Sequence, residues 1–187
     1  MFRMLLLFLF MALVVSGSMA VKRCSQQTPP DPAGVPGDPS VIVALADGST
    51  MVAPHGTIGR ELVDWLATRE PGQKAFELGG QEFVGRTAQP TTESLGRIPH
   101  LIAMLRANPD VNVVIVGHTD PSGDEAADRA ISQARADVVL GILRNGRIAS
   151  DRLSTEARGA SDPAVPNDSL ANRRRNQRVS LILSRAE

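Results

Sequence analysis

The segment VNVVIVGHTDPSGDEAADRAISQARADVV, residues 111–139, contains a strand signal and a helix signal separated by a sharp change of chain direction. The run from Val111 to Val116 is apolar and rich in valine, which indicates a buried strand. Asp120 follows the carboxyl end of this strand, where the chain must turn. From Asp124 to Arg144 apolar residues recur at helical spacing, and the expected apolar face consists of Ala127, Ile131, Ala134, Val138 and Ile142.

The flanking sequence continues the alternation of strands and helices. Upstream, we expect a strand or extended chain over 76–86 and a helix over 91–107. Downstream, a third strand is expected to start at 152–155, a short helix over 169–176, and the last strand over 179–183. This order predicts an α+β fold, a βαβαβ-type two-layer sandwich of helices on a mixed sheet.

Residues 41–72 are predicted to form a small ββα module in front of the larger domain at 73–187. Two β-rich runs flank the dipeptide Asp47-Gly48, which is a strong signal for a tight hairpin. A helix should follow, with one apolar face formed by Ile58, Leu62, Trp65 and Leu66. Because so small a module rarely folds alone, we expect its Trp65 face to pack on the larger domain.

The N-terminal part of the chain indicates export. Residues 1–24 contain an uncharged run of 18 residues, from Met4 to Val21, which fits either a membrane anchor or a cleaved signal peptide. Lipidation at Cys24 is disfavoured because Lys22 and Arg23, rather than small residues, precede it. Residues 25–40 form a proline-rich linker, which would span roughly 50 Å if fully extended.

Composition excludes several classes of function. Twenty basic and twenty acidic residues cancel, so the chain has no net field that would attract nucleic acid. Outside residues 1–24 the aromatic residues are only Trp65, Phe76 and Phe83, too few for stacking on sugars or bases. The three histidines show no metal-ligand spacing, and we expect His118 to be a packed or hydrogen-bonded residue. No catalytic or cofactor-binding motif occurs, so we expect neither an enzyme nor a cofactor.

Several motifs in the right order carry a family resemblance. They are the segment from GHTD at 117–120 to RADVV at 135–139, GASDPAVPND at 159–168 and RRRNQRVSL at 173–181. Over about residues 75–185 the chain resembles the C-terminal domain of the outer-membrane protein A family, shared with peptidoglycan-associated lipoprotein and flagellar stator B subunits. The resemblance implies a bacterial envelope protein that faces the periplasm, either membrane-anchored or exported, with an outer-membrane association among the options.

The resemblance also implies a ligand and its site. In this family the domain binds meso-diaminopimelate in the peptidoglycan stem, through positions that correspond here to Asp120 and Arg135. An acidic acceptor and a forked guanidinium suit the ammonium and carboxylate that diaminopimelate carries on one carbon. Thr119, beside Asp120, is a further predicted ligand-binding residue. Because Arg135 lies at i+7 from Asp128, flanking the apolar stripe, we do not expect it in the core.

The sequence departs from the family at residues 128 and 177, and the roles of the charged residues Asp128 and Arg178 stay open. The family commonly has Asn where Asp128 stands and Arg where Gln177 stands. Asp128 would either help hold the ammonium or pair with Arg135 and weaken binding. Arg178 is predicted either to contact the ligand or to form a structural ion pair.

The expected function is noncovalent tethering of a membrane or complex to the cell wall. The alternative is an envelope scaffold whose ββα module recruits a protein partner, with wall binding secondary.

Overall fold

The computed structural model describes residues 42–78 and 82–185. Residues 40–187 form one compact unit. The predicted anchor or signal at 1–24 and the predicted linker at 25–40 lie outside the described residues. Within the described part of the chain, no helix is both long enough and apolar enough to span a bilayer.

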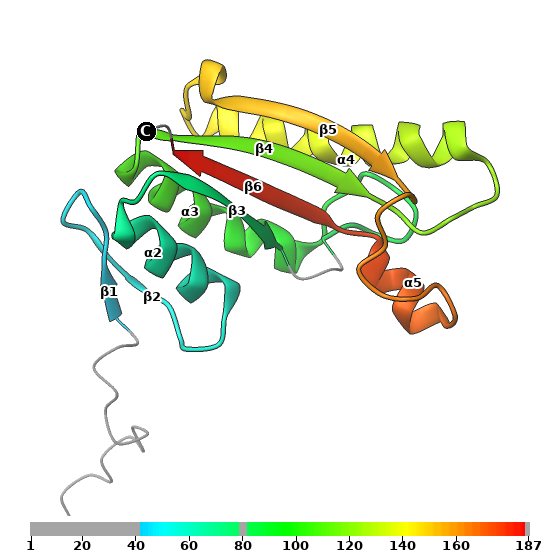
Figure 1. Ribbon diagram of the computed structural model, residues 1–187, viewed down its shortest axis with the longest axis horizontal. Coiled ribbons are helices and arrows are strands. Elements are labelled where there is room, and N and C mark those ends of the chain that lie inside the picture. The colour runs from blue at the N-terminus through cyan, green and yellow to red at the C-terminus, as the bar shows by residue number, and fades with distance from the viewer. Residues whose placement is uncertain (1–41, 79–81, 186–187) are drawn as a thin grey trace, which may run out of the picture. The chain divides into compact units, whose positions relative to one another are not determined.

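A four-stranded mixed sheet forms the centre of this unit (Figure 1). Its strand order is β3 (Gly72–Glu77), β6 (Val179–Arg185), β4 (Val111–His118) and β5 (Leu153–Gly159). β4 runs parallel to β5 and antiparallel to β6, and β6 runs antiparallel to β3. The expected α+β sandwich with a mixed sheet is therefore confirmed.

Helices α3 (Thr92–Ala107) and α4 (Glu125–Asn145) cover one face of the sheet, as Figure 1 shows. Side chains cap both helices at the N-terminus: the Thr91 hydroxyl accepts from the Ser94 amide, and the Asp124 carboxylate accepts from the amides of Ala126 and Ala127. The 3-10 turn η2 (Ser150–Arg152) leads into β5, and α5 (Leu170–Asn176) leads into β6. These caps fix the residues at which α3 and α4 begin.

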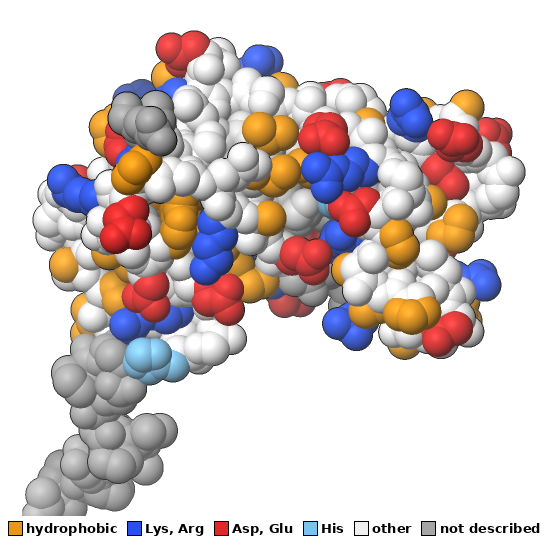
Figure 2. Space-filling model, viewed as in Figure 1, with side chains coloured by type: hydrophobic (Ala, Val, Ile, Leu, Met, Phe, Trp, Pro, Cys, Tyr) orange, Lys and Arg blue, Asp and Glu red, His pale blue; other side chains and the backbone are white. Residues whose placement is uncertain are grey.

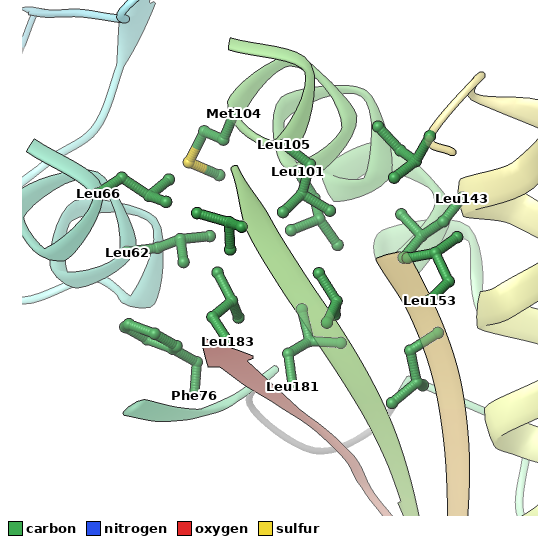
Figure 3. Close-up of a cluster of buried hydrophobic side chains, with 14 of the residues drawn as sticks. Leu62, Leu66, Phe76, Leu101, Met104, Leu105, Leu143, Leu153, Leu181 and Leu183 are labelled. Carbon is green, nitrogen blue, oxygen red and sulfur yellow. The ribbon is translucent and has the colours of Figure 1, made fainter. Parts of the chain in front are cut away.

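The N-terminal module packs on this sandwich through the predicted face. Strands β1 (Ile42–Ala44) and β2 (Thr50–Val52) form a separate hairpin, and α2 (Ile58–Thr68) follows. The ring of Trp65 meets Phe76 of β3 edge to face with centroids 6.0 Å apart, and the Arg185 guanidinium lies 5.6 Å above the Trp65 ring. Figure 3 shows Leu62 and Leu66 of α2 in the same apolar cluster as Phe76 and Leu183.

Apolar side chains from both layers close the core. Leu101, Met104 and Leu105 of α3 meet Leu181 and Leu183 of β6 there (Figure 3). Leu105, Leu181 and Leu183 have no exposed surface. At about 25 cal/mol per Å² of apolar area, this burial is the main stabilising term of the fold.

Two expectations from the sequence are wrong. The strand expected over 76–86 is β3, which begins at Gly72 and ends at Glu77. The buried face of α4 is not the expected apolar stripe, because Ala127 is exposed and the residues that are buried are Asp128, Ser132, Arg135, Ala136 and Leu143.

The physical reason is close backbone contact between α4 and β4. A Cβ atom at Gly117 would lie 1.9 Å from the carbonyl oxygen of Ser132, so the helix rests on the strand at this point. Val138 and Ile142 of the expected stripe instead line an apolar groove of about 520 Å³ between the module, α3 and α4.

Candidate ligand-binding site

Asp120 begins the connection between β4 and α4, and its carboxylate is nearly buried. The Oδ1 atom accepts a 2.7 Å hydrogen bond from Nη1 of Arg86, and the same nitrogen donates to the Asp120 carbonyl at 2.8 Å. Thr119 is buried, with its amide bonded to the Gly159 carbonyl at 2.9 Å and its hydroxyl 3.4 Å from Asp120 Oδ1. Thr119 therefore fixes the position of Asp120 against β5.

Arg135 projects from α4 under the loop that precedes α3. Its Nε donates to the Thr87 carbonyl at 2.9 Å, and its Nη2 donates to the Gly85 carbonyl at 2.7 Å and to Oε1 of Gln177 at 3.2 Å. Its Nη1 donates to the His118 carbonyl at 3.1 Å. Four carbonyl oxygens thus surround one guanidinium.

The expectation that Arg135 lies outside the core is wrong. Its side chain is 0% exposed, and its guanidinium stacks 5.2 Å from the centre of the Phe83 ring. Burial, followed by the nearby positive charge of Arg86, lowers the pKa of Arg135 to about 10. The group therefore stays charged at neutral pH and is held by backbone dipoles rather than by a carboxylate.

Asp128 pairs with Arg86, which is not among the predicted site residues. Its carboxylate accepts from Nη2 of Arg86 at 2.6 Å and from the Ser122 amide at 2.9 Å. Burial raises the pKa of Asp128, but the hydrogen bonds from Ser122 and Arg86 outweigh it and hold the pKa below its usual value. In the described residues Asp128 is thus the partner of Arg86, and the expected alternative of an ion pair with Arg135 is not formed.

A short turn carries Arg86 into the site, and we call residues 84–89 the 84–89 turn. The Val84 amide donates to the Gln89 carbonyl, and the Thr87 amide and hydroxyl both donate to the Val84 carbonyl. Gly85 has a φ of +50°, a conformation that favours glycine. The turn closes on itself and presents Gly85, Arg86 and Thr87 to the two predicted site residues.

The sequence analysis does not predict the 84–89 turn, and it names Gln177 only as a departure from the family and not as a site residue. The 84–89 segment has no apolar periodicity, and the sequence predicts strand or extended chain up to residue 86. One signal was available: an extra buried carboxylate at Asp128 requires a nearby cation, and Arg86 stands in a Gly-flanked segment that can turn.

Arg178 lies apart from these groups. Its Nε donates to Glu77 at 3.0 Å, and both terminal nitrogens lie 3.3 Å from the Asp162 carbonyl. Within residues 42–78 and 82–185, its side-chain hydrogen bonds and ion pair reach neither Asp120 nor Arg135. Figure 2 shows acidic and basic side chains side by side on the viewed face, rather than in a patch of one sign.

His118 is buried and hydrogen-bonded, as expected. Its Nε2 lies 2.9 Å from the Ser180 hydroxyl. Desolvation, and then the positive charge of Arg178, lower the pKa of His118 to about 4, so the ring is neutral at neutral pH. Among the described residues, His, Cys, Asp and Glu side chains form no cluster that could hold a metal ion.

A hollow of about 450 Å³ opens beside the 84–89 turn. It is lined by Phe83, Gly85, Arg86, Thr91, Glu93, Arg174 and Gln177. Arg86 and Gln177, which contact Asp120 and Arg135 respectively, therefore form part of its wall. The hollow thus borders the turn that contacts Asp120 and Arg135, although neither of these two side chains lines it.

Comparisons with known proteins place part of the chain in a family. Residues 85–177 match the OmpA family. The chain is 32% identical to the peptidoglycan-binding protein ArfA of Mycobacterium tuberculosis over 80 residues, which cover 43% of this chain and 24% of ArfA. It thus spans about a quarter of the length of that relative.

Two further comparisons cover more of the chain. The peptidoglycan-associated lipoprotein of Legionella pneumophila is 24% identical over 176 residues, which cover 92% of this chain and 93% of the lipoprotein. The cell wall anchor of the T6SS from Pseudomonas aeruginosa superposes with a TM-score of 0.54 at 25% identity, covering 72% of this chain and 100% of the anchor. This chain therefore carries an OmpA family domain over residues 85–177.

Proposed function

We propose that this domain binds peptidoglycan noncovalently through the diaminopimelate of the peptide stem and so tethers an envelope membrane or complex to the cell wall. The observation that carries the proposal is that Asp120 and Arg135 hold the same turn from two sides, through Arg86 and through the Gly85 and Thr87 carbonyls. The names of ArfA, the Legionella lipoprotein and the T6SS anchor support the same class of ligand.

The charges match one amino-acid terminus of diaminopimelate. Asp120 accepts from the ammonium, with Asp128 as a second anion close by, because both carboxylates already bind one cation. Arg135 binds the carboxylate with its planar fork, which a lysine could not do. Thr119 holds Asp120 in position, and Arg178 forms a structural ion pair with Glu77. Binding of this kind needs neither a cofactor nor a catalytic step.

Residues 1–40 would set the distance between the membrane and the domain. We propose that residues 1–24 connect the domain to a membrane and that the linker at 25–40 crosses the space between membrane and wall. The domain then faces the periplasm.

Cosedimentation with purified sacculi tests the proposal. The full chain in detergent should pellet with sacculi that contain diaminopimelate, and much less with sacculi that contain lysine, because a lysine stem lacks the carboxylate for Arg135. Arg135→Lys should lose this retention, whereas Arg129→Ala, which removes an exposed charge from the same helix, should keep it. Equal retention on both wall types would refute the proposed ligand, and full retention of a folded Arg135→Lys chain would refute the site.

A further inference from the structure

Three consecutive residues, Gly85, Arg86 and Thr87, contact both the acidic side chains and the arginine of the proposed site. Arg86 fills the space between the carboxylates of Asp120 and Asp128, with hydrogen bonds of 2.7 and 2.6 Å. Its two neighbours, Gly85 and Thr87, give their carbonyl oxygens to Arg135. Arg86 thus stands where a ligand ammonium would bind, and the flanking carbonyls stand where a ligand carboxylate would bind.

We propose that Arg86 determines which ligands the site accepts, by competing with the ligand ammonium for Asp120 and Asp128. The inference rests on the proposed function and adds a residue that selects the ligand. The ligand enters when the 84–89 turn moves off the site, and it must then replace every bond that the turn supplied.

A ligand with only one charge cannot replace both sets of bonds. An ammonium alone satisfies the two carboxylates but leaves the buried guanidinium of Arg135 without the carbonyls of Gly85 and Thr87. A carboxylate alone satisfies Arg135 but leaves Asp120 and Asp128 buried without a cation. Leaving a buried charged group unpaired is costly, so the closed turn favours a ligand that carries both charges.

The geometry allows the turn to move as a unit. Its internal hydrogen bonds join Val84, Thr87 and Gln89 to one another, and these bonds do not depend on the site. The Arg86 side chain is 36% exposed, and the hollow of about 450 Å³ lies beside it. Release of Arg86 therefore breaks two ion pairs without breaking the turn itself.

Titration of the full chain in detergent with two probes tests this role. The probes are meso-diaminopimelate and 1,5-diaminopentane, which has ammonium groups but no carboxylate. In Arg86→Ala the dissociation constant for diaminopimelate should fall about tenfold, the factor expected when one or two charge-assisted hydrogen bonds no longer hold the closed form. The affinity for diaminopentane should rise by a larger factor than the affinity for diaminopimelate. The reason is that Asp120 and Asp128 become free to bind an ammonium, while the turn still supplies the hydrogen bonds of Arg135.

Two further variants make the result specific. Asp128→Asn removes one anionic partner of Arg86 and, at the same time, one anionic partner of the ligand ammonium, so it should tighten diaminopimelate binding less than Arg86→Ala does. Arg129→Ala removes an exposed arginine of α4 and should leave both constants unchanged, which controls for net charge. Weaker diaminopimelate binding by Arg86→Ala would show that Arg86 is a direct ligand contact, and unchanged binding would show that it does not compete; either result overturns the proposal.

Amide hydrogen exchange without ligand separates this inference from the proposed function. Residues 84–89 should exchange faster in Arg86→Ala than in Arg129→Ala. Unchanged exchange there overturns the competition by Arg86 even if wall binding holds. Absence of diaminopimelate binding in every variant, with faster exchange in Arg86→Ala, overturns the proposed function and with it the selection of a ligand.

Discussion

Gly117 of β4 and Ser132 of α4 touch through their backbones: a Cβ atom on Gly117 would lie 1.9 Å from the Ser132 carbonyl oxygen. The Ser132 hydroxyl also accepts a 3.0 Å hydrogen bond from the Gly159 amide of β5. This contact sets the distance between the helix and the sheet. Because Asp128 and Arg135 lie on the same face of α4 as Ser132, it also sets the depth at which they enter the site.

Gly117→Ala should therefore push α4 off the sheet. We expect the free energy of unfolding to fall by about 1 to 3 kcal/mol. The added methyl group would clash with backbone atoms of Ser132, which cannot move aside as the end of a flexible side chain could. The control is Gly141→Ala in the same helix, where a Cβ meets no atom within 4 Å. That variant should be neutral or more stable by about 0.5 to 1 kcal/mol. Urea unfolding measures both, and equal stability of the two variants would contradict the close contact.

The N-terminal module should behave as part of one cooperative unit. Leu62 of α2 is 2% exposed and lies in the core cluster with Phe76. Leu62→Ala should lower the free energy of unfolding by about 2 to 5 kcal/mol, with a single transition. Val52→Ala, at a side chain that is 60% exposed, should change it by less than about 0.5 kcal/mol. Two separate transitions in the wild-type chain would show that the module unfolds independently.

Stability should fall in mild acid because of His118. Its pKa is about 4 in the folded chain against an ordinary value of 6.5, so the unfolded chain binds the proton more readily. The contribution is fully present above pH 6.5 and is lost as the pH falls from 6.5 towards 4, with a total of up to about 3 kcal/mol.

His118→Gln should flatten the stability profile between pH 6.5 and 4.5, whereas His100→Gln, at an exposed histidine, should keep it. Denaturant midpoints at a series of pH values give the comparison. A wild-type profile that is already flat over this range would rule out the buried neutral ring as its cause.

Arg178 should matter for stability and not for the ligand. Its side chain is 5% exposed and holds Glu77 and the Asp162 carbonyl. Arg178→Ala should reduce the free energy of unfolding by about 1 to 3 kcal/mol, because the Asp162 carbonyl and Glu77 both lose a charged donor in a part-buried position. The dissociation constant for diaminopimelate should stay within about twofold, a difference of less than 0.5 kcal/mol. A tenfold weaker affinity in the folded variant would place Arg178 in the site.

Much of the fold followed from periodicity. The valine run of β4 and the long helix of α4 could be predicted because burial imposes a recognisable spacing on each. The orientation of α4 could not be predicted, because the side chains that face the sheet include Asp128, Ser132 and Arg135. Apolar periodicity does not identify a buried helix face that is made of polar residues. The 84–89 turn was missed for a related reason, since its order comes from local hydrogen bonds and not from a repeating pattern.

The residues of the site divide in the same way. Asp120 and Arg135 came from a motif, but the partner of Asp128 depends on a residue 42 positions earlier in the chain. Only the fold brings Arg86 to that carboxylate.

A crystal structure of the chain bound to a diaminopimelate-containing stem peptide tests the central claim most directly. We expect the ligand ammonium at hydrogen-bonding distance from Asp120, the ligand carboxylate on the guanidinium of Arg135, and Arg86 moved away from both Asp120 and Asp128. A ligand bound elsewhere on the domain, with Arg86 still between the two carboxylates, would contradict it.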